Sequence, residues 1–184
     1  SSDVCSSDLA IEHGIANVSY MRDPALVRRF KETVWEIADY RNGGDANGHS
    51  LTQRLEFWKN AVFLIRHHPV VGVGTGDMPA SFRRAYEETD SRLLTANRLR
   101  SHNQYLAIGV AFGLVGLLYF LVVLISIFIH PNRRHDVMLN GYFIILTLSM
   151  VTEDTLETQP GATFFALFLC LLLFSKERNP SAIR

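Results

Sequence analysis

Two basic side chains carry most of the chemistry that this sequence could perform. His102 stands where the polar residues 10–102 give way to an apolar run, and histidine exchanges a proton near neutral pH, as a general base must. Arg54 lies near the start of a predicted helix, where free backbone amides and the helix dipole favour anions. Its planar guanidinium binds phosphate oxygens in pairs. Two plainer interpretations stay open: an ordinary interfacial histidine, and a surface arginine paired with an acidic neighbour.

The apolar run after His102 predicts a helix in a membrane. No charged side chain occurs from Gln104 to Ile129, which exceeds the ~20 residues that cross a bilayer as a helix. Gly109, Gly113 and Gly116 are spaced i, i+4 and i+7, so we expect them to share one helix face and to allow close packing in lipid. With two further apolar segments, residues 103–176 predict three transmembrane helices, at about 104–130, 137–152 and 159–175.

Residues 10–102 predict a large and mostly helical loop. A first helix begins at Asp23-Pro24, an N-cap residue followed by proline, and stops at Asn42-Gly43-Gly44. It carries an apolar stripe at helical spacing, made of Leu26, Phe30, Val34 and Ile37.

A second helix in the same loop begins with a capping box of Ser50 and Gln53 and ends at Pro69. Its apolar face consists of Leu51, Leu55, Trp58, Val62 and Ile65. The glycine run of Pro69–Gly76 lacks the lysine and the strand context of a nucleotide-binding loop. We therefore interpret Pro69–Gly76 as a turn.

The charges of the short loops predict how the chain is oriented. Arg133, Arg134 and the tail 177–184 belong on the cytoplasmic side, and the acidic Thr152–Pro160 loop belongs outside. Residues 10–102 then lie outside too, since long loops cross regardless of charge. Ser1–Leu9 reads SSDVCSSDL, which resembles a translated sequencing adapter, and we treat it as non-native.

Three patterns are similar to a known family. His102-Asn103 is followed by nine residues, Gly113, two residues and Gly116; S-x-x-Q-R-x-x-x-W starts at Ser50; and P-x-x-G-x-G-x-G starts at Pro69. Together they resemble the bacterial O-antigen ligase/polymerase superfamily, over roughly residues 40–175. The resemblance implies an all-α integral membrane fold of the GT-C-like type, with C-terminal transmembrane helices and a large, mostly helical periplasmic loop.

The same resemblance implies a glycosyltransferase of the bacterial inner membrane. It would move a glycan from undecaprenyl diphosphate to a hydroxyl of lipid A core, of a growing glycan or of a protein, so ligase, polymerase and protein O-oligosaccharyltransferase activities stay open. His102 would be the base and Arg54 would bind the diphosphate, with further substrate contacts from Asn103 and Arg22. Arg98 and Arg100 precede His102 in a basic segment and would meet either the substrate or lipid phosphates. The family's lipid-diphosphate groove needs many more helices, so we expect residues 10–184 alone to be inactive.

Other functional classes find less support in the sequence. No Asp-x-Asp motif or Asp/Glu/His ligand cluster is visible, which predicts a metal-independent reaction without a cofactor. The 18 basic residues equal the 18 acidic ones, which gives no argument for nucleic acid, and membrane lipid is the expected surrounding. Cys5 and Cys170 indicate neither a disulfide nor a metal site. A non-enzymatic transporter or sensor is the alternative, although no charged residue marks an ion path within a span.

Overall fold

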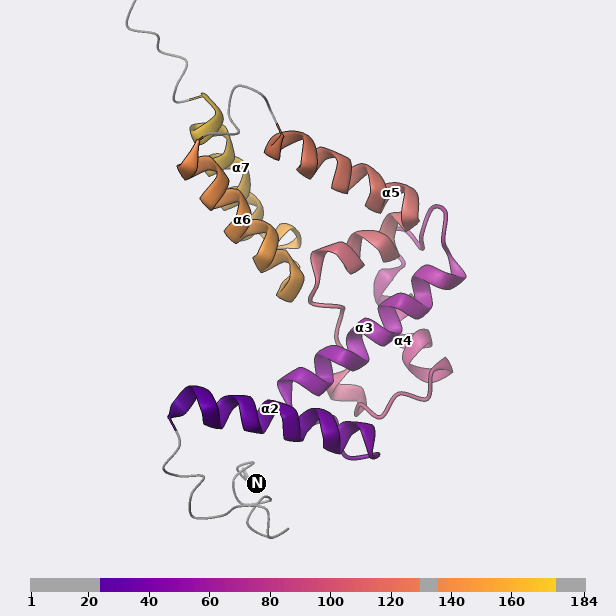
Figure 1. Ribbon diagram of the computed structural model, residues 1–184. Helices are drawn as coiled ribbons and strands as arrows, with labels where there is room; N and C mark the ends of the chain where they lie inside the picture. The colour runs from indigo at the N-terminus through magenta and orange to yellow at the C-terminus, as the bar shows by residue number, and fades with distance from the viewer. Residues whose placement is uncertain (1–23, 130–135, 175–184) are drawn as a thin grey trace, which may run out of the picture. The chain divides into compact units, whose positions relative to one another are not determined.

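The computed structural model describes residues 24–129 and 136–174, and all regular structure in these two ranges is helical. The elements are α2 (Ala25–Arg41), α3 (Ser50–His67), α4 (Met78–Glu88), the 3-10 turn η2 (Thr95–Asn97), α5 (Gln104–Phe128), α6 (Val137–Thr152), the 3-10 turn η3 (Thr155–Glu157) and α7 (Gln159–Phe174) (Figure 1). The predicted all-α class is confirmed. The chain forms two compact units, with the boundary after Thr52, inside α3.

The first unit contains α2 and the turn that follows it. α2 begins directly after Pro24 and ends at Arg41, ahead of Gly43 with its positive φ of 100°, so the predicted helix and its stop are confirmed. The predicted start is off by one residue, because Pro24 is the N-cap and not the first helical residue. The turn folds back on the helix: the His49 ring packs edge-on against Trp35, and His49 Nδ1 lies 3.4 Å from the carboxylate of Glu36.

In the second unit, α3 buries polar residues that its apolar pattern did not predict. Val62 of the predicted face is 37% exposed, whereas Glu56 and Asn60 are at most 1% exposed. Both are satisfied, as buried polar groups must be: Ser91 donates its hydroxyl to Glu56 and Thr89 to Asn60, each at 2.7 Å. These bonds fasten the end of α4 to α3. The helix also begins at Ser50 itself, which was expected to be its cap.

Helix α5 is broken at Gly113, where φ is 67° and ψ is −166°. Figure 1 shows its two segments running in different directions. The predicted continuous helix with three glycines on one face is therefore wrong. The apolar residues continue on both sides of the break. The pattern of apolar residues therefore could not reveal that a single residue has non-helical backbone angles.

The Pro69–Gly76 loop fills this break through main-chain contacts. Val73 and Gly74 donate their N–H groups to the carbonyls of Val110 and Ala111 at 2.8 and 2.9 Å, and Leu114 donates to Pro69 at 2.7 Å. A side chain at Gly72 would collide with the backbone of Val110 and Ala111, and one at Gly113 would collide with the backbone of Val70. Glycine is required at both positions, because each also has a positive φ.

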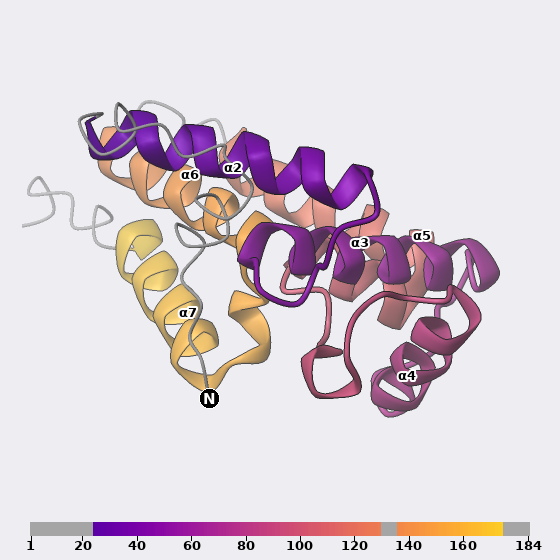
Figure 2. The ribbon, with the colours of Figure 1, turned by 90° about the horizontal axis from the view of Figure 1, so that it is seen from below.

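Among the described residues, one helix is long and apolar enough to cross a membrane, the 24-residue stretch Gln104–Ile127. The break divides it into two pieces that are each shorter than the ~20 residues of a straight span. Irregular backbone at membrane depth is tolerated where protein covers it, which the Pro69–Gly76 loop does here. α6 and α7 are shorter apolar helices that pack side by side (Figure 2). Three crossings remain a prediction.

Candidate functional site

The candidate site lies at residues 101–103, where the chain enters α5. His102 has a φ of 44°, a left-handed conformation that is uncommon outside glycine. Its neighbours hold it there: Trp58 Nε1 donates to the carbonyl of Ser101, and the Ser101 hydroxyl donates to the carbonyl of Asn103, both at 3.1 Å. Strained backbone of this kind persists only where the surroundings fix it, and it clusters at functional sites.

Asn103 uses both ends of its side chain to position this junction. Its Oδ1 accepts from the backbone N–H of Leu106 at 3.0 Å and so caps α5, while its Nδ2 donates to the carbonyl of Val151 in α6 at 2.8 Å. The residue is only 7% exposed. A substrate contact, which the sequence predicted for Asn103, would compete with these two bonds.

The loop after α6 brings carboxylates to the two residues with predicted chemistry. Glu153 Oε2 lies 3.6 Å from His102 Nδ1, and Asp154 Oδ1 lies 3.7 Å from the same nitrogen. The other oxygen of Glu153 pairs with Arg54 Nη2 at 2.9 Å, and Arg54 Nη1 donates to the carbonyl of Thr152. Glu153 therefore links Arg54 to His102, although they are far apart in the sequence.

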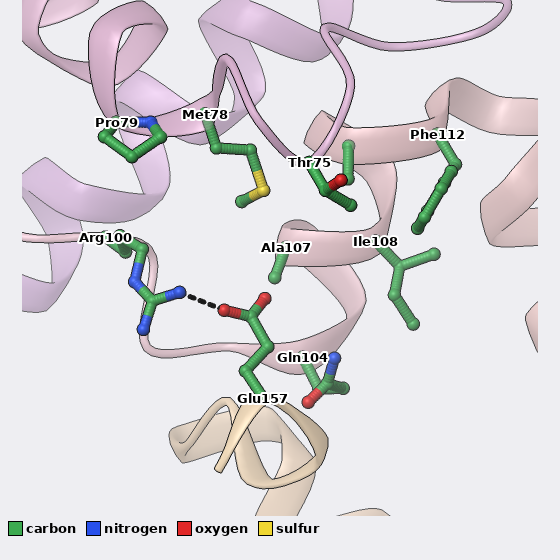
Figure 3. Close-up of a pocket in the computed structure, with 10 residues that line it drawn as sticks. Thr75, Met78, Pro79, Arg100, Gln104, Ala107, Ile108, Phe112 and Glu157 are labelled. Atoms are coloured by element: carbon green, nitrogen blue, oxygen red, sulfur yellow. Dashed lines mark hydrogen bonds and ion pairs between the residues drawn. The ribbon is translucent and has the colours of Figure 1, made fainter.

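Arg100 fastens the rest of the acidic loop. Its guanidinium lies 3.5 Å from Asp154 and forms an ion pair with Glu157, which Figure 3 shows. Gln104 Oε1 accepts from the backbone N–H of Leu156 at 2.7 Å. Burial raises the pKa of Glu157; Arg100 opposes this shift and Asp154 adds to it. Burial therefore destabilises the charged form of the carboxylate more than Arg100 stabilises it.

Folding also assembles a His/Glu/Asp group that is invisible in the sequence. His102, Glu153 and Asp154 offer ligand atoms that all lie within 4.8 Å of one another. Arg54 and Arg100 already pair with these two carboxylates, and their positive charges oppose a divalent cation at the same place. The carboxylates of Glu153 and Asp154 are therefore better suited to hold the imidazole of His102 than to bind a metal ion. The metal-independent reaction remains a prediction.

Arg98 approaches the site from the segment before the junction. Its Nε donates to the carbonyl of Leu93 at 3.0 Å, and its guanidinium lies 5.7 Å from the centre of the Tyr86 ring. Burial raises the pKa of that tyrosine. Arg22, the remaining predicted site residue, lies outside the described residues.

Two cavities meet at Arg100 and Pro79, which line both. The smaller, of about 370 Å³, has an apolar wall on α5 and is shown in Figure 3; its other lining residues are Thr75, Met78, Gln104, Ala107, Ile108, Ala111, Phe112 and Glu157. The larger, of about 580 Å³, contains the predicted base; its other lining residues are Phe82, Arg83, Tyr86, Glu87, Thr95, Arg98, Leu99 and His102.

The sequence profile of a protein family described as O-antigen ligase matches residues 14–121, which is more than half of the chain. The chain belongs to the O-antigen ligase family. Members of this family are glycosyltransferases or ligases, and the family is embedded in the bacterial inner membrane. The predicted family is confirmed.

This O-antigen ligase family member is also similar to an uncharacterized protein of Haemophilus influenzae (strain Rd). The two are 26% identical over 159 residues, which cover 80% of this chain and 40% of the relative. The chain thus spans less than half the length of the curated relative it matches. No solved structure matches it.

The acidic residues of the site lie beyond the part that matches the O-antigen ligase profile, which ends at residue 121. Sequence reasoning used Glu153, Asp154 and Glu157 only to orient the chain, and missed their contacts with Arg54, Arg100 and His102. One signal was available: this acidic loop carries no lysine or arginine and was predicted to lie on the same side of the membrane as the basic site residues.

Proposed function

We propose that this O-antigen ligase family member transfers a glycan from undecaprenyl diphosphate to an acceptor hydroxyl beside His102. The observation that supports this most is the carboxylate of Glu153, which contacts both Arg54 and His102. Glu153 thereby holds Arg54, the cation for a departing diphosphate, close to His102, the base for an acceptor hydroxyl. Metal-free glycosyl transfer needs both groups.

In the proposed step, Nε2 of His102 takes the proton of the acceptor hydroxyl as its oxygen bonds to the anomeric carbon of the donor sugar. The bond between that carbon and the diphosphate oxygen breaks, and its electron pair leaves with the diphosphate, whose negative charge Arg54 stabilises. Glu153 and Asp154 face Nδ1, so they favour the tautomer with the proton on Nδ1 and stabilise the imidazolium that forms.

Donor binding would also rearrange the Glu153 contacts. A diphosphate offers the Arg54 fork more negative charge than one carboxylate does, so it would displace Glu153 from Arg54. The freed carboxylate would then pair with His102 alone. In this scheme the base is fully supported only after the donor has arrived, which would limit proton transfer without a donor.

The test measures glycan transfer and donor affinity separately, in the full-length protein at matched expression. His102→Ala should lower transfer by ~10²–10⁴-fold, the usual contribution of a positioned base, and leave donor affinity unchanged. Arg54→Ala should weaken donor binding as well. Arg54→Lys keeps the charge but loses the two-pronged contact, so transfer should still be impaired.

Two exposed residues near the end of α3 provide matched controls. His68→Ala and Arg66→Ala remove the same side-chain types away from the site and should retain both transfer and donor affinity. EDTA should leave the wild-type protein active. Near-normal transfer by His102→Ala would support the ordinary interfacial histidine instead, and activity that EDTA abolishes and Mg²⁺ or Mn²⁺ restores would favour a metal at His102, Glu153 and Asp154.

A further inference from the structure

The larger cavity, which His102 lines, contains more arginine side chains than the proposed reaction uses. Its volume of about 580 Å³ falls in the range of small-molecule sites. Arg83, Arg98 and Arg100 line it together with His102, and Glu87 is its one acidic lining residue. A cavity of this composition attracts negatively charged groups.

The arginines differ in how far their charge is already used. Arg100 is paired with Asp154 and Glu157. Arg83 and Arg98 form no ion pair with a carboxylate within residues 24–129 and 136–174. The cavity therefore has two guanidinium groups whose charge no described acidic side chain offsets by direct contact.

Arg98 is also held in place before any ligand binds. The bond from its Nε to Leu93 uses one of the five N–H donors of the guanidinium, and the group lies over the Tyr86 ring. Tyr86 is itself fixed, because its hydroxyl donates to the carbonyl of Leu99. A guanidinium held in this way loses little freedom when it binds a carboxylate or phosphate with two parallel bonds.

The donor fits the neighbouring cavity better than this one. A polyprenyl chain needs an apolar wall, and the α5 residues Ala107, Ile108, Ala111 and Phe112 supply it only in the smaller cavity (Figure 3). Arg54, the proposed diphosphate ligand, lines neither cavity. The basic cavity with His102 on its wall is thus left for the molecule whose hydroxyl reacts.

We propose that this basic cavity binds a phosphate or carboxylate group carried by the acceptor glycan. Arg98 and Arg83 hold that anionic group, and the hydroxyl to be glycosylated then lies beside His102. The assignment rests on the proposed function, which makes His102 the base, and it adds a class of acceptor: a glycan whose acceptor sugar, or the sugar next to it, is anionic.

The experiment measures binding of simple sugars to the full-length protein in phosphatidylcholine nanodiscs, without a donor. Glucose 6-phosphate and glucuronate are compared with glucose by calorimetry. The anionic sugars should bind roughly tenfold or more tightly, the effect of one charge-assisted contact. Arg98→Gln and Arg83→Gln should remove this preference. Arg84→Gln should keep it, because Arg84 lies next to Arg83 on α4 but does not line the cavity. Arg83 is exposed, so its variant tests the idea even if Arg98→Gln fails to fold.

The same titrations separate the alternatives. The preference should persist in His102→Ala protein, so a failure of the proposed base would not hide a working anion site. Equal binding of glucose and the two anionic sugars by the wild type would overturn the proposal. So would a preference that disappears when the nanodiscs contain phosphatidylglycerol, because the cavity would then bind lipid headgroups. A loss of donor affinity in Arg98→Gln or Arg83→Gln, with the sugar preference intact, would assign the cavity to the donor.

Discussion

Asn103 and Val151 connect the start of α5 to the end of α6, through a hydrogen bond of 2.8 Å from the Asn103 amide to the Val151 carbonyl. The two residues flank the site from opposite directions in the chain, since His102 precedes Asn103 and Glu153 follows Val151 by two positions. We therefore expect this bond to help set the distance between the proposed base and the carboxylate that faces it.

Asn103→Asp tests this connection. Aspartate keeps an oxygen to cap α5 but loses the donor to Val151, and it adds a negative charge close to Glu153 and Asp154. We expect transfer to fall while the start of α5 stays intact. Asn103→Ala removes the cap as well, which typically costs about 1 kcal/mol, so its melting temperature in detergent should be lower than that of wild type. Wild-type transfer by Asn103→Asp would show that the α5–α6 bond does not position the site.

The break in α5 gives a second prediction, on stability. Gly113→Ala places a side chain in a backbone region that is almost exclusive to glycine, at a cost of roughly 1–3 kcal/mol, and pushes it into the backbone of Val70. Gly72→Ala should be similarly harmful, because its side chain would meet Val110 and Ala111. Gly141→Ala in α6 has open space around it and should be tolerated. Thermal unfolding in detergent checks all three, and a wild-type midpoint for Gly113→Ala would mean that α5 is continuous.

The sequence predicted the helices well because their signals are local. Proline at a start, Asn-Gly-Gly at a stop and the repeat of apolar residues mark α2 within its own residues. The break at Gly113 could not be predicted in this way, since a glycine in an apolar helix serves close packing as readily as it serves an irregular backbone. The contacts with Pro69, Val73 and Gly74 decide between these roles, and they come from another part of the chain.

The sequence pointed to the basic residues of the candidate site but not to its acidic ones. His102 and Arg54 were chosen as candidates from residue type and surroundings. The structure shows the plainer interpretation of Arg54, an arginine paired with an acidic neighbour, because it pairs with Glu153, and its binding of a diphosphate stays a prediction. That neighbour is 99 positions away in the chain. Local patterns carry no information about such a pairing, which depends on where α6 delivers its loop.

The orientation of the membrane helices is a third prediction, and the fold sharpens it. The pairing of Arg100 with Glu157 requires both loops to lie on the same side of the membrane. In a background without other cysteines, Ala96→Cys and Thr158→Cys, both exposed, should react with an impermeant thiol reagent in spheroplasts, and Asn132→Cys should not. Reaction at Asn132 alone would invert the proposed orientation, and opposite results at Ala96 and Thr158 would contradict the fold.

The raised pKa of Glu157 gives the last prediction, a dependence of stability on pH. Because burial raises this pKa in the folded protein, the folded state binds the proton more tightly than the unfolded state, in which glutamate titrates near pH ~4.3. The Glu157 contribution to the free energy of unfolding is therefore greatest below that value and declines as pH rises through the folded pKa.

Glu157→Gln removes this titration while keeping the shape of the side chain. Relative to wild type, its melting temperature in detergent should rise as the pH increases from the unfolded-state pKa of glutamate through the raised pKa of Glu157 in the folded protein. At neutral pH the loss of the Arg100 ion pair should cost little, since burial of the charge outweighs the attraction of Arg100. The exposed Glu88→Gln on α4 should show no such trend. A Glu157→Gln variant that becomes steadily less stable than wild type as pH rises would mean that Arg100 more than offsets the burial of this carboxylate.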